Sequence, residues 1–459
     1  MSEKFDDVVV GSGQAGPFLA VRLANAGRKV AVVERKLFGG TCVNTGCTPT
    51  KTMIASAEVA HKARDAARYG VHIAGDVRVS LAEVKERADK IVAESRNGIE
   101  NMLNSTPNCT VFRGTARFVS PHALTVNGQE IEAERIFLNV GGRAAVPDMP
   151  GVKDVPFLNN SSLLQLTELP EHLVVVGGGY IGMEFAQMFR RFGSKVTVVE
   201  MGPRLCSHED PDVSDALAEL FRQEDTHLRL YAKCIAFSHS DKDVCVHVDC
   251  TEGPPEIVGS HILLAVGRVP NTDDLGLEAA GVKTDDRGFI PVDDKLVTNV
   301  PHIFAIGDVN RRGAFTHTSY NDFEIVAANL LDGEERKVTD RIQCHALYTD
   351  PPLAQVGMTE TEVRKSGRKA LMATRAMTRV GRANEKGENF GFMKALVDAE
   401  TKQILGASIL GVTGDEAIHC ILDIMYAKAP YTLLTHAVHI HPTVSELIPT
   451  LFEDLKPLQ

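Results

Sequence analysis

Two stretches of the chain share one pattern of apolar and polar positions. Each begins with an apolar, β-branched run, passes through G-x-G-x-x-G into a segment with helical periodicity, and ends in a second apolar run. The runs predict buried parallel strands, and the segment between them predicts an amphipathic helix. The stretches are Asp7–Glu34 and Leu173–Glu200. We therefore expect two α/β units with the same strand–helix–strand order.

Three further apolar runs end at glycines and have the character of buried parallel strands. They are Ile136–Gly142, Ile262–Arg268 and Ile303–Asp308. The carboxyl ends of such strands are where α/β sheets bind ligands. Because the first and third runs flank the second unit, this unit, from about Pro150 to Asn271, is predicted to be inserted into the first domain.

The texture of the chain changes beyond Arg341. Period-2 stretches and a turn-rich hairpin, GFMKALVDAETKQILGASIL, precede a helix expected from about Gly414 to Lys428. This pattern predicts an α+β domain without a nucleotide fingerprint. An apolar face on the expected helix, formed by Ile418, Leu422 and Met425, suggests that the domain serves assembly.

The glycine motifs have a specific chemical meaning in this context. Glycines allow a tight turn and let a pyrophosphate approach the N-terminus of the helix, and the acidic residue that ends each unit accepts hydrogen bonds from an adenosine ribose. The structural alternative is a pair of nucleotide-free units in which the glycines serve helix–sheet packing. Two copies imply two dinucleotides, or one domain duplicated for a single ligand. The residues concerned are Gly11, Gly13, Gly16 and Glu34 in the first unit, and Gly177, Gly179, Gly182 and Glu200 in the second.

Composition narrows the class of protein. The 459 residues include 49 Lys and Arg against 60 Asp and Glu, a formal net charge of −11, which argues against a general nucleic-acid or anionic-membrane surface. No apolar run approaches the ~18 residues of a membrane span. The chain enters an apolar strand within a few residues of its start, without a signal sequence, so we expect a cytoplasmic protein. Nine scattered cysteines do not form a disulfide scaffold.

One pair of cysteines stands out. Cys42 and Cys47 lie in GGTCVNTGCTPTKTM, directly after the first unit and before a helix expected at about Pro49–Tyr69. A helix N-terminus and Lys51 would both favour a thiolate, so the pair is predicted to be redox-active. Zinc is the alternative, and it would need two more ligands at matching spacing. Cys245 and Cys250 have the same spacing, but within an expected strand we interpret them as unrelated buried thiols.

These motifs together resemble the FAD-dependent pyridine-nucleotide–disulfide oxidoreductases, which include lipoamide dehydrogenase, glutathione reductase and mercuric reductase. GGTCVNTGCTPTK resembles the redox motif, FAIGDV the FAD ribityl-binding strand end, GGGYIGMEFA the NAD(P)H fingerprint, and HPTVSE the acid–base motif. AFTHTSYNDFEIVAANL and VHIHPTVSEL are similar to the mercuric-reductase-like group, including reactive-chlorine-resistance flavoproteins. The resemblance implies an FAD-binding domain in two parts, an inserted NAD(P)H-binding domain and a dimerisation domain. The implied boundaries are 1–149 and 272–340, 150–271, and 341–459.

The resemblance also implies roles for individual residues. Cys47 would form the thiolate contact with the flavin, and Cys42 would attack a small disulfide substrate. His441, oriented by Glu446, would act as the acid–base catalyst from the other subunit of a homodimer. Lys51 and Glu184 would pair near the flavin, and His317 would place its backbone at the flavin. Further cofactor contacts would come from the glycines and acids above together with Thr41, Gly114, Gly142, Tyr180, Gly267 and Asp308.

Several of these residues have plain structural alternatives. Lys51 could be an exposed helix lysine, and Glu184 could favour the start of its helix through the macrodipole alone. Thr443 and Glu446 form a capping box, which needs no catalysis. His441 could be a hydrogen-bonded structural histidine. His436, His439 and His441 could capture a metal, but we favour packed histidines, so no metal site is predicted.

Departures from the family pattern bear on the substrate. The chain ends LFEDLKPLQ without the cysteine pair that delivers Hg(II) in mercuric reductases, which puts mercury turnover in doubt. The leading expectation is an NAD(P)H-dependent reductase of a small disulfide or oxidised thiol. Reduction of Cu(II) or Hg(II) by the same thiols, a lipoamide dehydrogenase, and a non-catalytic flavin-binding protein are the alternatives. Glu200 favours NADH, with NADPH possible because Arg204 follows four residues later.

Overall fold

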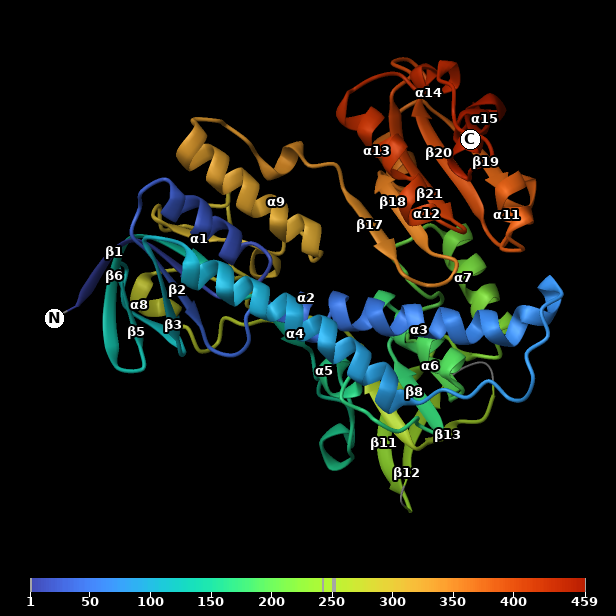
Figure 1. The fold of residues 1–459 in the computed structure, drawn as a ribbon, viewed down its shortest axis with the longest axis horizontal. Coiled ribbons are helices and arrows are strands. Elements are labelled where there is room, and N and C mark those ends of the chain that lie inside the picture. Colours follow the sequence, from blue (N-terminus) through green and yellow to red (C-terminus); the bar gives the residue numbers. More distant parts are fainter. Residues whose placement is uncertain (1, 242, 250–252, 459) are drawn as a thin grey trace.

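The computed structural model describes residues 2–241, 243–249 and 253–458. The chain forms three domains (Figure 1). The first α/β domain contains both the N-terminal segment and helix α9 (Thr316–Ala327), the inserted domain lies between them in the sequence, and the C-terminal domain follows. Long helices α3 (Cys47–Asp65) and α4 (Leu81–Ser105) run side by side from the first domain to the inserted domain.

The first α/β domain is built on a parallel sheet. Strand β1, Glu3–Val10, is buried over its last four residues and pairs in parallel with β2 on one side and β6 on the other. The carboxyl half of β6 pairs in parallel with β16, although about 170 residues separate them, and its amino half pairs with β5 in an antiparallel hairpin. The remaining strands are β2 (Val30–Glu34), β3 (Cys109–Arg113), β4 (Ala116–Ser120), β5 (Ala123–Val126), β6 (Gln129–Leu138) and β16 (Ile303–Ala305).

Helices cover this sheet. Helices α1 (Gly16–Asn25) and α9 pack against each other and, with residues of α4, bury the apolar faces of β1 and β2. The short helix α2 (Gly40–Thr45) leads directly into α3, and α8 (Leu277–Ala280) packs on β4.

The inserted domain repeats the same architecture. Strands β8, β9, β10 and β14 form a parallel sheet in the order β10-β9-β8-β14, covered by the apolar faces of α6 and α7. A two-stranded ribbon of β7 and β15 joins the chain where it enters and leaves this domain. The elements are β7 (Gly142–Ala144), α5 (Asn160–Leu163), β8 (His172–Val176), α6 (Tyr180–Phe192), β9 (Lys195–Val199), α7 (Pro211–Gln223), β10 (His227–Arg229), β11 (Lys233–Ser240), β12 (Asp243–Asp249), β13 (Glu256–Gly259), β14 (His261–Leu264) and β15 (Arg268–Pro270).

The C-terminal domain contains an antiparallel sheet in the order β17-β18-β21-β20-β19-β22. The expected hairpin is confirmed as β20 and β21, whose central residues pair in register. The elements are β17 (Cys344–Leu347), β18 (Leu353–Gly357), α10 (Glu360–Ser366), β19 (Ala370–Ala376), α11 (Gly381–Glu385), β20 (Phe392–Asp398), β21 (Ile404–Leu410), α12 (Gly414–Ala417), α13 (His419–Tyr426), α14 (Thr432–His436), α15 (Ile448–Leu451) and β22 (Lys456–Pro457).

The predicted fold class is confirmed, but local expectations change. The helix expected at 49–69 begins two residues earlier, at Cys47, and continues as a 3₁₀ turn over Ala66–Tyr69. The helix expected at 414–428 is divided into α12 and α13. The prediction that its apolar face serves assembly is wrong, because Ile418 and Leu422 are buried in the core of their own domain.

Cys245 is buried in β12, as predicted, whereas Cys250 lies outside the described residues. The helices that the structure describes include none with both the length and the apolar composition needed to cross a bilayer.

Candidate active site

The first glycine loop follows β1 and packs tightly on Asn139. Gly11 has φ +99°, and a Cβ there would lie 2.3 Å from the carbonyl oxygen of Asn139. A Cβ at Gly13 would lie 2.9 Å from Asn139 Oδ1, and one at Gly16 would lie 2.4 Å from the carbonyl oxygen of Gly11. The loop therefore needs glycine for packing. It also places the N-terminus of α1, a favourable position for a phosphate, at the carboxyl end of the parallel sheet.

Glu34 ends β2 beside this loop. Its Oε2 accepts hydrogen bonds from the backbone N–H (2.9 Å) and the hydroxyl (2.6 Å) of Ser12, and its Oε1 accepts one from the backbone of Lys36. Gly114 follows the neighbouring strand β3, and its N–H donates to the carbonyl oxygen of Glu34. The acid and both glycine-containing turns thus meet at one edge of the sheet, as the fingerprint predicts.

A buried polar network fixes the carboxyl end of β16. The Asp322 carboxylate accepts hydrogen bonds from Gly307 N (2.8 Å) and Asn310 Nδ2 (2.9 Å), and it forms a buried ion pair with Arg341. Asp308 follows Gly307, and burial raises the pKa of its carboxyl group while Arg268, 3.9 Å away, opposes that change. Asp308 therefore follows the carboxyl end of β16, and β6 separates this strand from β1 in the sheet.

The two cysteines lie on consecutive helices. Cys42 is in α2, and Cys47 is the first residue of α3, so that the N-terminus of a long helix faces its sulfur. Both are free thiols. Helix α2 is held against the first glycine loop, because Gly39 N donates to the carbonyl oxygen of Ser12 and a Cβ at Gly40 would lie 2.9 Å from Gly13 Cα. The exposed Thr41 lies in the same turn. The cysteine pair is thereby fixed beside the first glycine loop.

The environments of the two thiols shift their pKa values in opposite directions. A hydrogen bond from the Cys42 thiol, together with contacts to Thr316 and Lys51, lowers the pKa of Cys47 to about 6. The same hydrogen bond, with burial, raises the pKa of Cys42. The Cys47 sulfur lies 3.2 Å from the Thr316 hydroxyl. In the dithiol form, Cys47 is therefore the thiolate and Cys42 holds the proton.

Lys51 and Glu184 connect the first domain to the inserted domain. The Lys51 ammonium lies 2.7 Å from Glu184 Oε2 and 4.7 Å from the centre of the Tyr348 ring. Glu184 Oε1 accepts a hydrogen bond from the backbone of Tyr348. Glu184 is buried and Lys51 only partly exposed, so both are more than surface residues of their helices. Lys51 lies one helical turn after Cys47, which explains its effect on that thiol.

The N-terminus of α9 also meets the thiol pair. Thr316 is its first residue, and His317, which follows, donates a hydrogen bond of 2.8 Å through Nε2 to the carbonyl oxygen of Cys344. Because a carbonyl oxygen can only accept, this nitrogen carries the proton. His317 thus anchors the first domain to the C-terminal domain next to the cysteines.

The second glycine loop resembles the first at its first and third glycines. A Cβ at Gly177, which has φ +111°, would lie 2.5 Å from the carbonyl oxygen of Ala265, and one at Gly182 would lie 2.1 Å from that of Gly177. A Cβ at Gly179 would instead point into open space, so packing does not explain this glycine. Close approach of a ligand does. Gly142 and Gly267 lie at the β7–β15 ribbon, where the two domains join.

Glu200 directly follows β9 and lies beside the second loop. Its oxygens accept hydrogen bonds from Gly178 N and Gly202 N, both at 2.7 Å. Arg204, which could approach a phosphate, has its Nε 3.1 Å from Asp215 Oδ1 on α7. The arginine is therefore directed toward another carboxylate.

A network that the sequence did not predict surrounds Tyr180. The hydroxyl of Tyr180 donates a short hydrogen bond to Glu209 Oε1, and His345 Nε2 lies 2.7 Å from the same oxygen. Burial, followed by the charge of Glu209, raises the pKa of Tyr180. Glu209 comes from the loop before α7 and His345 from β17, so neither has a local sequence motif that marks it.

His441 and Glu446 are paired at the outer end of the C-terminal domain. His441 Nδ1 lies 2.9 Å from Glu446 Oε2, and the ring is 80% exposed. Glu446 N donates to the Thr443 hydroxyl, as in a capping box, but the carboxylate is directed to His441. The segment between α14 and α15 lies away from α2 and α3 (Figure 1), so one chain does not unite this pair with its own cysteines.

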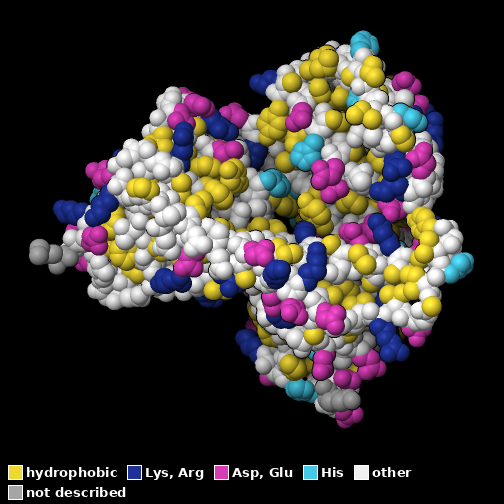
Figure 2. All heavy atoms as spheres, in the orientation of Figure 1, with side chains coloured by type: hydrophobic (Ala, Val, Ile, Leu, Met, Phe, Trp, Pro, Cys, Tyr) yellow, Lys and Arg dark blue, Asp and Glu magenta, His cyan; other side chains and the backbone are white. Residues whose placement is uncertain are grey.

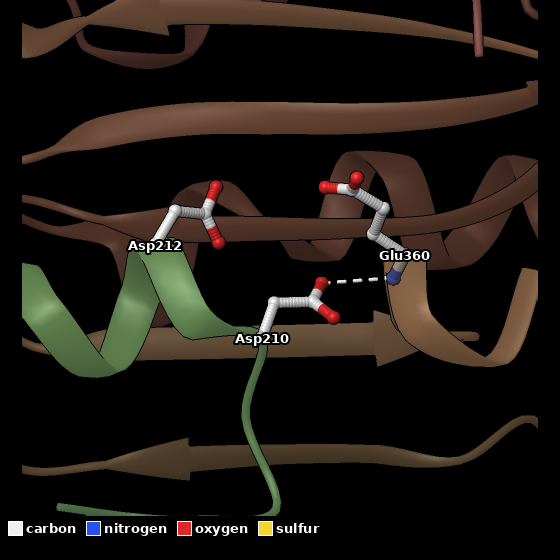
Figure 3. A group of neighbouring side chains, drawn as sticks. All are labelled: Asp210, Asp212 and Glu360. Carbon is white, nitrogen blue, oxygen red and sulfur yellow. Dashed lines mark hydrogen bonds between the residues drawn. The ribbon is translucent and has the colours of Figure 1, made fainter. Parts of the chain in front are cut away.

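Three carboxylates gather between the inserted and C-terminal domains (Figure 3). Asp210, Asp212 and Glu360 lie within 4.8 Å of one another, which is the only such group of possible metal ligands in the described part of the chain. The ammonium of buried Lys394 lies 3.0 Å, 2.8 Å and 3.4 Å from them. The Lys394 ammonium occupies the place that a metal cation would take among the three carboxylates. Its ion pairs therefore clamp the inserted domain to the C-terminal domain.

The structure therefore unites most of the predicted site. The cysteines, Lys51, Glu184 and the α9 N-terminus converge where the three domains meet, and Figure 2 shows a hollow there. Sequence reasoning missed Asn139, Thr316, Glu209 and His345. Asn139 could have been found, since it lies within the apolar run Ile136–Gly142. Glu209 and His345, in contrast, meet only through the fold.

Comparisons with known proteins identify the family of the chain. The family model described as "Pyridine nucleotide-disulphide oxidoreductase" matches residues 5–322, and that of its dimerisation domain matches residues 344–452. The chain is 36% identical to "Probable pyridine nucleotide-disulfide oxidoreductase RclA" of Escherichia coli (strain K12), over 99% of this chain and 100% of that protein. It is 31% identical to a dihydrolipoyl dehydrogenase of Chlamydia muridarum, over 97% of this chain and 96% of that one.

Solved structures give the same result. The structure described as "Cu(II) complex of HOCl-induced flavoprotein disulfide reductase RclA from Escherichia coli" superimposes with a TM-score of 0.89 at 36% identity, covering 98% of this chain and 99% of that one. A mercuric reductase of Bacillus cereus is 30% identical over 95% of this chain and 70% of its own length. Both domain models and full-length relatives match, and the chain belongs to the pyridine nucleotide-disulphide oxidoreductase family.

Proposed function

We propose that this enzyme uses NAD(P)H to reduce a small disulfide through the Cys42–Cys47 pair. Its family depends on FAD and NAD(P)H, and the disulfide substrate is our inference. The carrying observation is the asymmetry of the pair, with a Cys47 thiolate fixed at a helix N-terminus beside Thr316 and a protonated Cys42 next to it. A structural or zinc-binding pair does not need two thiols of opposite protonation.

The two glycine loops provide fitting cofactor sites. The first loop, Glu34 and Asp308 would hold FAD, and the second loop and Glu200 would hold the nicotinamide dinucleotide. The open space at Gly179 and the backbone-lined turn at Gly11 fit a pyrophosphate in each case. FAD, when bound, supplies the two-electron centre between NAD(P)H and the cysteine pair.

The chemistry of the thiols follows from their protonation. Once a base has removed its proton, Cys42 attacks one sulfur of the substrate disulfide and forms a mixed disulfide. This step releases one thiolate, which takes up a proton. Cys47 then attacks the Cys42 sulfur, releases the second thiol and closes the Cys42–Cys47 disulfide. Two electrons from NAD(P)H restore the dithiol. Each turnover converts one disulfide, one NAD(P)H and one proton into two thiols and NAD(P)⁺.

Cys42 needs a base, because its environment raises its pKa. His441, held by Glu446, is suited to that task, but it is directed to solvent in its own chain. The neighbouring Val438 and Ile440 are 100% and 80% exposed, which leaves an apolar segment uncovered around the histidine. A homodimer would cover this segment and bring His441 of the partner subunit to Cys42. The matched dimerisation domain supports this arrangement.

A reducing cytoplasm is the compartment that we propose. Every cysteine in the described part of the chain is a free thiol, which is usual where thiols are kept reduced.

An anaerobic titration tests the proposal. One equivalent of NADH added to the FAD-loaded enzyme should produce a long-wavelength absorbance band from the Cys47 thiolate, together with two titratable thiols. A panel of lipoamide, glutathione disulfide, other small disulfides, Cu(II) and Hg(II) then identifies the substrate. Absence of both the band and new thiols would refute a disulfide reductase and favour a flavin-binding protein.

Cu(II) reduction is the second candidate. A relative 36% identical to this chain has been solved as a Cu(II) complex, and paired thiolates are ligands and reductants for a soft metal. In the panel, turnover with Cu(II) but not with any disulfide would replace the first proposal with this one.

A further inference from the structure

Glu209 is a buried acid with one unexplained oxygen. The residue is 7% exposed, and its Oε2 has no hydrogen-bond partner among the described residues. His345 is the only ion-pair partner of the Glu209 carboxylate in the part of the chain that the structure describes. A buried, unpaired carboxylate oxygen costs free energy, so its retention calls for a reason other than stability.

The position of Glu209 relates it to the path between the second glycine loop and the thiols. Tyr180 follows Gly179, and Glu184 lies one turn further on the same face of α6, where it pairs with Lys51. Tyr180 therefore lies on α6 between the second glycine loop and the Glu184–Lys51 pair beside the cysteines. The Tyr180 hydroxyl is bonded to Glu209.

A stack of rings continues this path. The ring of Tyr180 stacks on His345 at a centroid distance of 5.3 Å, and His345 stacks on Phe315 at 5.4 Å. Phe315 precedes Thr316, which contacts Cys47. The carboxylate thus lies beside a chain of ring contacts that leads from Tyr180 toward the thiol centre, and the Tyr180 hydroxyl and His345 Nε2 are both hydrogen-bonded to its Oε1.

Hydrogen bonds and an ion pair fix the segment that carries Glu209. Glu209 N donates to the carbonyl oxygen of Cys206. The next residue, Asp210, accepts a hydrogen bond from Glu360 N at the start of α10 (Figure 3). It also accepts one from Thr361 N and pairs with Lys394. The negative charge is consequently held in place before any ligand binds.

We propose that Glu209 is a positioning residue whose buried negative charge makes the nicotinamide pocket favour the cationic, oxidised ring over the neutral, reduced ring. This inference rests on the proposed dinucleotide site of the second glycine loop. Donation of a hydride, which carries two electrons and one proton, converts the neutral nicotinamide ring of NADH into the cationic ring of NAD⁺. A fixed, desolvated carboxylate beside the ring's path stabilises that charge and so favours reduction of the enzyme.

Binding of three ligands to the FAD-loaded enzyme tests the inference without turnover. NAD⁺ has a cationic ring, 1,4,5,6-tetrahydro-NAD has a neutral ring that cannot donate, and ADP-ribose has no ring. Calorimetry gives a Kd for each. The wild type should bind NAD⁺ more tightly than tetrahydro-NAD. Glu209→Gln should weaken NAD⁺ roughly tenfold relative to tetrahydro-NAD, because one charge near the ring is lost. Binding of ADP-ribose should not change.

Two variants separate charge from shape. Glu209→Asp keeps the charge but shortens the side chain, so its preference for NAD⁺ should stay within about threefold of the wild type. Glu219→Gln removes an exposed charge from the neighbouring helix α7 and should change nothing.

Equal effects of Glu209→Gln and Glu209→Asp, or no wild-type preference for NAD⁺, would overturn the inference. The wild-type comparison decides the matter even if Glu209→Gln does not fold. If the wild type binds none of the three ligands, the proposed dinucleotide site itself is wrong, which is a different failure.

Discussion

The hydroxyl oxygen of Thr316 lies 3.2 Å from the sulfur of Cys47, although 269 residues separate them in the sequence. The contact joins the first residue of α9 to the first residue of α3. Two helix N-termini therefore meet at one sulfur, and both favour its negative charge. This relationship underlies the expected pH dependence of the enzyme.

Cys47 should lose its thiolate only in acid. Its pKa is lowered to about 6, so in the dithiol enzyme the thiolate is present at pH 7 and is lost as the pH falls through about 6. Cys42→Ala should raise this midpoint most, since the hydrogen bond from Cys42 is the largest cause, and Thr316→Val should raise it less. The rate of Cys47 alkylation against pH measures the midpoint. Thr52→Val is the control, because the Thr52 hydroxyl forms its hydrogen bond within α3.

Each cysteine of the pair should be essential for disulfide turnover. Cys42→Ser and Cys47→Ser should abolish reduction, yet retain FAD, because the proposed FAD contacts lie in the glycine loop, Glu34 and Asp308. Cys47→Ser should also lose the long-wavelength band. Cys245→Ser, on remote strand β12, should leave turnover intact. Turnover near the wild-type rate in either of the first two variants would eliminate the thiol assignment.

Complementation should reveal a shared active site. A mixed dimer of Cys47→Ser and His441→Ala chains contains one site with both an intact cysteine pair and an intact histidine, so part of the activity should return. Val438→Asp should place a charge in the proposed interface and reduce both dimer mass and activity. A mass near that of one 49.8 kDa chain in a fully active wild-type sample would contradict the homodimer.

NADH should be preferred to NADPH. Glu200 would repel a 2′-phosphate, at a cost of roughly 1–3 kcal/mol in specificity. Glu200→Ala should therefore narrow the ratio of kcat/KM for the two cofactors. Asp215→Asn should also improve NADPH use, because it releases Arg204 from its ion pair. A wild-type preference for NADPH, or a ratio that Glu200→Ala leaves unchanged, would exclude the ribose role of Glu200.

Lys394 should be important for stability. Its ammonium is fully buried among Asp210, Asp212 and Glu360, and removal would leave these carboxylates facing one another. Lys394→Met should therefore destabilise the protein by about 3–5 kcal/mol. Lys369→Met, at an exposed ion pair, should change stability by less than about 0.5 kcal/mol. Denaturant midpoints of both variants measure the difference, and equal midpoints would show that the clamp contributes nothing.

The sequence by itself determined the repeated α/β units, the order of domains and the family. These features depend on local patterns, because strand and helix periodicity and glycine spacing are set by residues near one another in the chain. The Cys42–Cys47 pair and the His441–Glu446 pair, each five residues apart, also belong to this class.

Only the tertiary structure decided which residues meet. The buried side of the α13 helix could not be inferred, because its apolar face is equally suited to its own sheet or to a partner, and the sheet covers it. Thr316, Glu209 and His345 reach the site from three separate segments, and contacts of high sequence separation leave no local periodicity. The protonation of Cys47 is likewise decided by the fold, since it depends on Cys42, Thr316 and Lys51 at distances that only packing sets.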